Sequence, residues 1–259
     1  MSALFTSETS VVRKIWGRSD TILFIFAGAA AEFALNKAVD WLYFTGKLPS
    51  DPLGRLFTTV SYAKDIVFAT TEKAHQAIDK ISHIHQHVEQ SRGYSIPDWA
   101  YRDVLFMLIH YSIAAYELLE KKLTKAEKDE VYDVFYRLGL RMQIPELPPN
   151  YAAWLPVRAA HLQQNLTYSH FTADLFKQYK KHLGHFRFRI LLEGQKLIVP
   201  TIVKKLLHLN NKSLLRPAVP FYKISKTLQV DALIRHCLLP SAYRDKINAL
   251  DRSPLQMSR

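Results

Sequence analysis

The chain has 259 residues, of which 48% are hydrophobic and only eight are glycine, a composition that favours long helices over a turn-rich β fold. Its single cysteine, Cys237, excludes an intramolecular disulfide and any zinc or iron–sulfur site built from several cysteines. The formal net charge is +12, and the whole excess lies in residues 177–259, which hold 17 Lys/Arg and four Asp/Glu.

Apolar residues recur with the period of a helix along most of the chain. Gly46 closes the first predicted helix, Asp98 is the expected N-cap of the fourth, and Thr124 with Glu127 forms a capping box for the fifth. The prolines at 145–149 break the chain, but the aromatic segment after them can share the same core, so we predict one all-α domain over 1–259. The helices are predicted at 21–44, 53–70, 72–90, 99–121, 124–142, 151–165, 167–183, 195–209 and 239–250.

Three alternating histidines, His83, His85 and His87, stand out in the third predicted helix. On a strand they would share one face and indicate a metal site, whereas on a helix successive residues turn by about 100°. An apolar stripe favours the helix and puts His85 on its buried face, with His83 and His87 towards solvent. A three-histidine site is therefore excluded. The stripe consists of Ala74, Ala77, Ile78, Ile81, His85 and Val88.

A second pattern lies on the preceding helix, where Arg55, Thr58, Thr59 and Tyr62 recur on one face. A buried arginine needs an anion or several acceptors, and a threonine hydroxyl can donate to bound oxygen or position water. The alternative is a surface arginine near a helix start, with Thr59 bonded back to its own helix.

His110 lies in the middle of a helix that has almost no polar face. It is the second candidate for contact with an iron ion, or for an outer partner that orients the ligand. A lone histidine on an apolar face, such as His85, has a structural alternative as a hydrogen-bonded core residue. A neutral imidazole facing an apolar cavity is equally what an axial haem ligand requires.

In order and spacing, these residues resemble the family of oxygenases that includes MpaB and the catalytic domain of latex-clearing rubber oxygenase. The similar stretch runs over 28–151, and the last third matches weakly. The segments that carry the resemblance are Asp51-Pro52-x-x-Arg55-x-x-x-Thr59, Ile84-His85-x-x-Val88, Leu123-Thr124-x-x-Glu127 and Gly139-x-x-Met142.

The resemblance implies an all-α fold, a non-covalent haem b and dioxygen-dependent cleavage of a carbon–carbon double bond in an isoprenoid chain. Residue by residue, it implies that His85 is the axial iron ligand and that Arg55 and Thr59 are the distal arginine and threonine. Rubber oxygenase carries a lysine that can cap the iron where this chain has Thr58, so the distal face here is open or capped by water. Asn36 and Lys37 stand where relatives often carry His-Pro.

Two functions follow as hypotheses. The first is a haem b-dependent oxygenase that takes dioxygen and an apolar, isoprenoid or prenylated substrate. The second is a non-catalytic helical protein that binds an apolar ligand or a membrane surface. The apolar run 21–35 is too short to span a bilayer and contains Glu32, so we expect a cytoplasmic protein whose basic part, 177–259, contacts a membrane peripherally. Nucleic acid is an unlikely partner, because the chain has no zinc finger or recognition helix.

Overall fold

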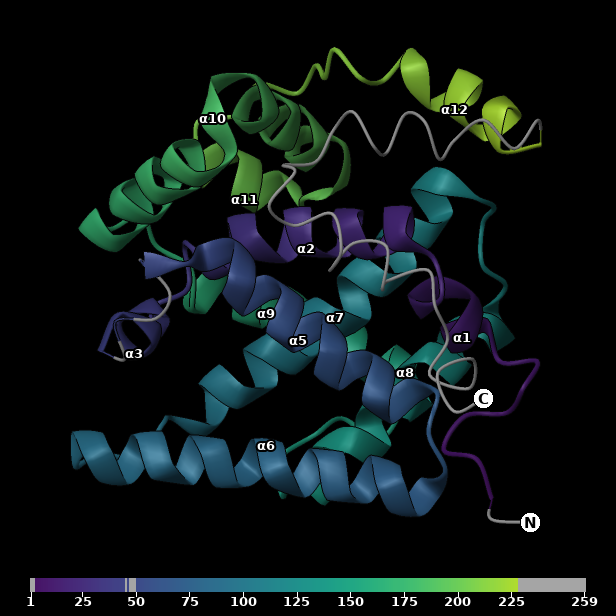
Figure 1. The fold of residues 1–259 in the computed structure, drawn as a ribbon, viewed down its shortest axis with the longest axis vertical. Coiled ribbons are helices and arrows are strands. Elements are labelled where there is room, and N and C mark those ends of the chain that lie inside the picture. The colour runs from purple at the N-terminus through teal and green to yellow at the C-terminus, as the bar shows by residue number, and fades with distance from the viewer. Residues whose placement is uncertain (1–2, 45, 47–49, 228–259) are drawn as a thin grey trace.

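In the computed structural model, the described residues are 3–44, 46 and 50–227, and the description covers only the backbone at 52, 53, 55, 56 and 224–227. Within these residues the chain forms helices and no strand, which confirms the all-α prediction (Figure 1). The helices are α1 (Val11–Trp16), α2 (Ser19–Phe33), α3 (Val39–Phe44), α5 (Pro52–Val67), α6 (Thr71–Arg92), α7 (Asp98–Leu119), α8 (Lys125–Arg141), α9 (Tyr151–Gln164), α10 (His170–Ile198), α11 (Thr201–Leu206) and α12 (Ala218–Thr227).

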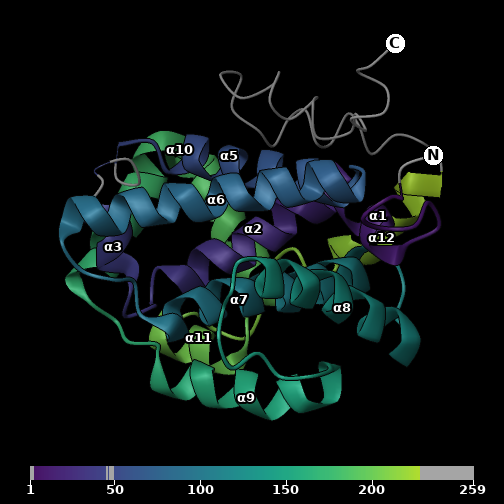
Figure 2. The ribbon, with the colours of Figure 1, turned by 90° about the horizontal axis from the view of Figure 1, so that it is seen from below.

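Helices α2 and α7 cross at the centre of the molecule, and the other helices pack around them. They approach closely because Gly28 of α2 has no side chain: a Cβ atom there would lie 2.3 Å from the ring of Tyr111 in α7. Trp16 of α1 adds to this contact, since its indole nitrogen donates to the hydroxyl of Ser112 at 3.1 Å. Figure 2 shows α6 and α9 on opposite sides of α7.

Helices α5 and α6 form a hairpin joined by the short turn at 68–70. Helix α5 begins at Asp51, whose carboxylate accepts a hydrogen bond from the Gly54 backbone N–H at 2.8 Å. A Cβ atom at Gly54 would lie 1.9 Å from that carboxylate, so the cap requires glycine there. Helix α6 ends at Gly93, which takes the left-handed conformation with φ 77°.

The predicted helix 21–44 is wrong in one respect, because the structure divides it into α2 and α3. Asn36 turns the chain between them through tertiary contacts. Its side-chain oxygen accepts from the backbone N–H of Ala38 at 2.9 Å, and its amide nitrogen donates to Asp103 at 2.8 Å. Its backbone also pairs with Leu166 in an isolated bridge. The local apolar pattern contains no trace of these partners.

Of the predicted N-terminal caps of α7 and α8, only the second is found in the structure. Asp98 is the first residue of α7, and the N-cap is Pro97, which makes no side-chain cap bond, so the predicted Asp98 cap was wrong. The capping box of α8 is confirmed: Thr124 accepts from the Glu127 backbone N–H at 3.2 Å, and Glu127 accepts from that of Thr124 at 2.8 Å.

Helix α10 consists of two helical arms that meet in a bend at Gly184, which has the non-helical angles φ 73° and ψ 168°, so the predicted helix end at 183 is confirmed and the helical residues 185–194 were not predicted. The bend is possible because glycine tolerates this left-handed conformation. The inner face of α10 forms a second, smaller core with α2 and α3. The predicted helix 195–209 is therefore divided, since 195–198 belong to α10 and 201–206 form α11, and the predicted helix 239–250 lies outside the described residues. The buried members of the second core are Ala34, Val39, Leu175 and Tyr179.

Candidate functional site

The histidine cluster lies on helix α6, and the predicted helical phase is confirmed. His83 and His87 are exposed, whereas His85 is half-buried. The Nδ1 atom of His83 lies 3.3 Å from the side-chain oxygen of Gln86, which keeps that ring along the outer face. Ala74 and Ile78, on the inner stripe of α6, are fully buried. Of the three histidines, His85 alone turns towards the interior.

His85 meets α7 through Tyr101. The two rings pack edge to face, with centroids 5.2 Å apart and planes at 70°. The phenol of Tyr101 donates to Glu89, one turn beyond His85 on α6, at 3.2 Å, and the same carboxylate oxygen accepts from the backbone N–H of Ile96 at 2.7 Å. Burial, together with Glu89, raises the pKa of Tyr101 well above its ordinary value, so the phenol stays a neutral donor. The ring beside His85 is therefore held in place.

Helix α5 carries the other predicted residues. Thr58 is exposed, and its hydroxyl donates to the carbonyl of Gly54 in its own helix at 3.0 Å. Thr59 is half-buried. Tyr62, one turn further along, faces α6, since the ammonium of Lys80 lies 5.9 Å from its ring centroid. Arg55 lies in the helix, and its side chain is outside the described part of the chain.

Together, α5 and α6 bring Thr59 and His85 onto two arms of one hairpin. Figure 1 shows the two helices meeting near the turn at 68–70 and diverging away from it. Thr59 lies on α5 and His85 on α6, and both are half-buried. The pairing of an α5 face with His85 in one site stays a prediction.

His110 does not belong to this arrangement. It follows Tyr101 by nine residues on α7, which is a rotation of about 180°, so it lies on the opposite side of the helix from the His85 contact. Its ring packs at 83° against Tyr111, with centroids 4.9 Å apart. Burial, aided by the charge of Arg158, lowers the pKa of His110 to about 3. The imidazole is therefore neutral, and it faces α9 rather than α6.

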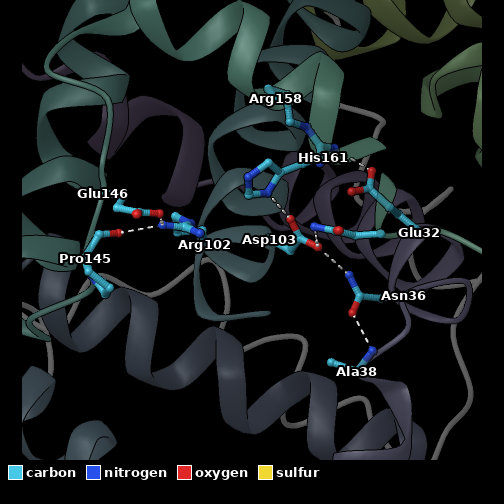
Figure 3. A network of polar contacts seen from close by, with 10 residues as sticks. Glu32, Asn36, Ala38, Arg102, Asp103, Pro145, Glu146, Arg158 and His161 are labelled. Atoms are coloured by element: carbon cyan, nitrogen blue, oxygen red, sulfur yellow. Dashed lines mark hydrogen bonds and ion pairs between the residues drawn. The ribbon is translucent and has the colours of Figure 1, made fainter. Parts of the chain in front are cut away.

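A buried ion pair joins α9 to α2 (Figure 3). The guanidinium of Arg158 in α9 donates to the carboxylate of Glu32 in α2 at 2.6 Å, and the phenol of Tyr111 donates to the same oxygen at 2.8 Å. The side chains of Glu32 and Arg158 are only 1% and 5% exposed. Burial opposes the charge on Arg158, but the Glu32 carboxylate outweighs it and raises the arginine's pKa. This pair fixes α9 against the central helices.

A second buried carboxylate, that of Asp103 in α7, joins its helix to the turn between α2 and α3 and to the end of α9 (Figure 3). One of its oxygens accepts from Asn36 at 2.8 Å and from Asn165 at 3.0 Å, and the other lies 2.5 Å from Nδ1 of His161. Lys37, beside Asn36, donates to the carbonyl of Gln164 at 2.6 Å. Asn36 and Lys37 thus tie the segment between α2 and α3 to the end of α9.

Sequence reasoning missed these buried polar contacts. Glu32 was visible as a charge inside an apolar run, but its partner, Arg158, is 126 residues away. Asp103 was equally visible, inside the helix that is apolar nearly all round. A charge in an apolar stretch is thus the signal that could have found the two networks, although it does not name the partner.

Two features are absent from the part of the chain that the structure describes. No three His, Cys, Asp or Glu side chains there come close enough together to hold a metal ion. No helix among the described residues has the length and apolar character needed to cross a membrane.

Comparison with known proteins places the chain in a family. The family model described as "ER-bound oxygenase mpaB/B'/Rubber oxygenase, catalytic domain" matches residues 13–248. The match extends well past the 28–151 stretch on which the resemblance was noticed, and covers most of the basic C-terminal part. No curated protein and no solved structure matched the chain. Because the family model spans most of its length, the chain belongs to the MpaB and rubber oxygenase catalytic-domain family.

Proposed function

We propose that the chain is a haem b-dependent oxygenase that cleaves a carbon–carbon double bond of an apolar, isoprenoid or prenylated substrate with dioxygen. Membership of an oxygenase family supports the reaction class. The observation that carries the cofactor is the placement of His85, half-buried on one arm of the α5–α6 hairpin and packed against Tyr101.

The residues around His85 fit a haem. A haem iron has four porphyrin nitrogens and needs only one imidazole from the protein, so the lack of a larger ligand cluster among the described residues is compatible with it. The flanking positions on the same stripe, Ile81 and Val88, are half-buried apolar residues suited to a porphyrin face. The diverging arms also supply a hydroxyl, that of Thr59, from the helix opposite.

Each residue has a defined task in this proposal. Haem, when bound, would supply the activation of dioxygen. His85 would hold the iron, and Tyr101, anchored by Glu89, would keep the imidazole plane fixed. Thr59 would donate a hydrogen bond, and Arg55 would supply positive charge, where negative charge develops on oxygen during the reaction.

A turnover assay on the haem-loaded protein tests the proposal. An isoprenoid alcohol would serve as substrate, with dioxygen consumption and carbonyl products measured together. The Thr59→Val variant should lose about tenfold or more in kcat, because removing one donor to a developing oxyanion costs about that much or more. The Thr59→Ser variant keeps the hydroxyl and should retain most activity. Ser61→Ala, an exposed position on the same helix, is the matched control.

The same assay separates the oxygenase from the non-catalytic alternative. Protein that binds the isoprenoid but takes up no haem and consumes no dioxygen would favour an apolar-ligand carrier. Equal activity of Thr59→Val and wild type would show that Thr59 has no role in the reaction. The cofactor proposal would be unaffected, because it is tested separately by haem binding.

A further inference from the structure

An exposed basic surface follows helix α10 on both sides of its bend at Gly184. Before the bend, positions 177, 180 and 181 lie on one helical face, and after it positions 185, 186 and 189 do the same. All six side chains are exposed. We call this set the α10 basic surface; its members are Lys177, Lys180, Lys181, His185, Phe186 and Arg189.

The positive charge of this surface is uncompensated. Residues 177–223 contain eleven Lys/Arg but a single acidic residue, Glu193. The carboxylate of Glu193 is occupied by Lys196 at 2.5 Å and by the backbone N–H of Leu214 at 2.7 Å. Among the described residues, no lysine or arginine of the α10 basic surface forms an ion pair, in contrast to α8, where Lys128, Arg137 and Arg141 each do.

A large apolar side chain, that of Phe186, is exposed among the basic residues of this surface. Phe186 is 70% exposed, whereas Phe188, two residues on, turns inward and packs at 78° against Phe176 in the second core. The bend between the arms is open, since a Cβ atom at Gly184 would meet no atom within 4 Å. In Figure 1, α10 runs along the edge of the molecule, with α2 beneath it. The exposed residues on both sides of the bend are therefore open to a partner.

We propose that the α10 basic surface docks this protein on an anionic lipid bilayer. Lysines and arginines near such a bilayer gain from its negative surface potential, and an exposed phenylalanine among them can enter the headgroup region. Phe186 favours lipid over nucleic acid, because it is the one exposed Phe, Tyr or Trp side chain among the described residues of α10, and stacking of successive bases needs several such rings. The proposal rests on this surface alone and holds with or without haem, although docking would bring an apolar substrate within reach.

Sedimentation with vesicles tests the docking. The full chain would be mixed at low salt with vesicles of phosphatidylcholine alone and with vesicles that contain about one-third phosphatidylserine, and the bound fraction measured. We expect binding to the anionic vesicles only, and its loss at high salt, because the attraction is screened within a Debye length. Equal binding to both vesicles, or to neither at low salt, would overturn the proposal.

Charge-matched variants locate the surface. Lys180→Glu/Lys181→Glu and Lys14→Glu/Lys125→Glu each lower the net charge from +12 to +8, and all four lysines are exposed. The first pair should weaken binding to anionic vesicles by about tenfold or more, and the second much less. Phe186→Ala should weaken it about fivefold, whereas Tyr94→Ala, at 73% exposure just past the C-terminal end of α6, should not.

Three outcomes would contradict the assignment. If both charge-reversed pairs lose equal affinity, net charge and not this surface attracts the vesicles. If Phe186→Ala binds like wild type, the apolar contact is absent. If a short DNA duplex binds the wild type more tightly than the vesicles do and loses affinity only with Lys180→Glu/Lys181→Glu, the surface serves nucleic acid. Circular dichroism of every variant checks that the fold is kept.

Discussion

Removing one partner of the Glu32–Arg158 ion pair should destabilise the protein severely. Both side chains are almost completely buried, and at 2.6 Å the guanidinium of Arg158 neutralises the carboxylate of Glu32. The Arg158→Met variant leaves a carboxylate in the core with only the Tyr111 phenol as a donor, and a buried charge without its partner costs about 3–5 kcal/mol. The free energy of unfolding of a folded domain is only about 5–15 kcal/mol, so this single change would remove a large share of it.

The double variant Glu32→Gln/Arg158→Met separates the ion pair from simple packing. Replacing both charges removes the uncompensated carboxylate, and exchange of a buried pair for neutral side chains is often close to neutral. We therefore expect the double variant to be more stable than Arg158→Met alone, with a coupling energy of about 2 kcal/mol or more. Urea denaturation followed by circular dichroism gives the free energy of unfolding of wild type, the two single variants and the double variant. If a single variant does not fold, the test becomes whether the double variant regains a folded spectrum.

A matched pair on the surface provides the control. Asp79 and Arg141 join α6 to α8 through two hydrogen bonds of 2.7 and 2.6 Å, but both side chains are about 40% exposed. Asp79→Asn should change the denaturation midpoint only slightly, because water solvates both charges once the contact is lost. The reasoning would be refuted if Arg158→Met were no worse than Asp79→Asn, or if the effects of Glu32→Gln and Arg158→Met simply added.

Two further predictions concern glycines and acid. Gly28→Ala should lower the melting temperature, because the new methyl group would overlap the Tyr111 ring at a cost of about 1–3 kcal/mol. Gly194→Ala should raise the melting temperature slightly, because its Cβ would lie 3.6 Å from Phe24 and alanine favours a helix over glycine. The reverse order of melting temperatures would contradict the close α2–α7 crossing. Hydrogen bonds from Lys121 and the Thr124 backbone lower the pKa of Glu127 to about 2. Because that pKa is depressed in the folded state, the advantage of wild type over Glu127→Gln should be complete above the ordinary carboxyl range and vanish as pH falls towards 2; melting curves that stay equally separated at pH 2 and pH 7 would count against it.

Local patterns in the sequence were sufficient for the hairpin that carries the candidate site. The apolar stripe of α6 selects His85 over His83 and His87, and the structure has this phase. The capping box at Thr124 and Glu127 could also be predicted, since both of its hydrogen bonds join residues within four positions of each other. Features of this kind can be predicted because the interacting groups are neighbours in the sequence.

Features that depend on distant partners could not be predicted in the same way. The break between α2 and α3 follows from the contact of Asn36 with Asp103, 67 residues away. The position of His110 follows from which side of α7 faces α9, and the periodicity of an almost wholly apolar helix does not define a side. The helical arm after Gly184 carries Phe188, which packs into a core that α10 shares with residues of α2 and α3, far away in the sequence.

Haem titration of four purified proteins tests the central claim most directly. Wild type, His85→Ala, His83→Ala and His87→Ala would be titrated with haemin and with reduced haem, and the Soret absorption recorded. The account predicts a sharp Soret band with one haem per chain in wild type, His83→Ala and His87→Ala. It predicts loss or a marked shift of that band in His85→Ala alone, with partial recovery when free imidazole is added. A His85→Ala spectrum identical to wild type, or a wild-type protein that takes up no haem, would contradict it.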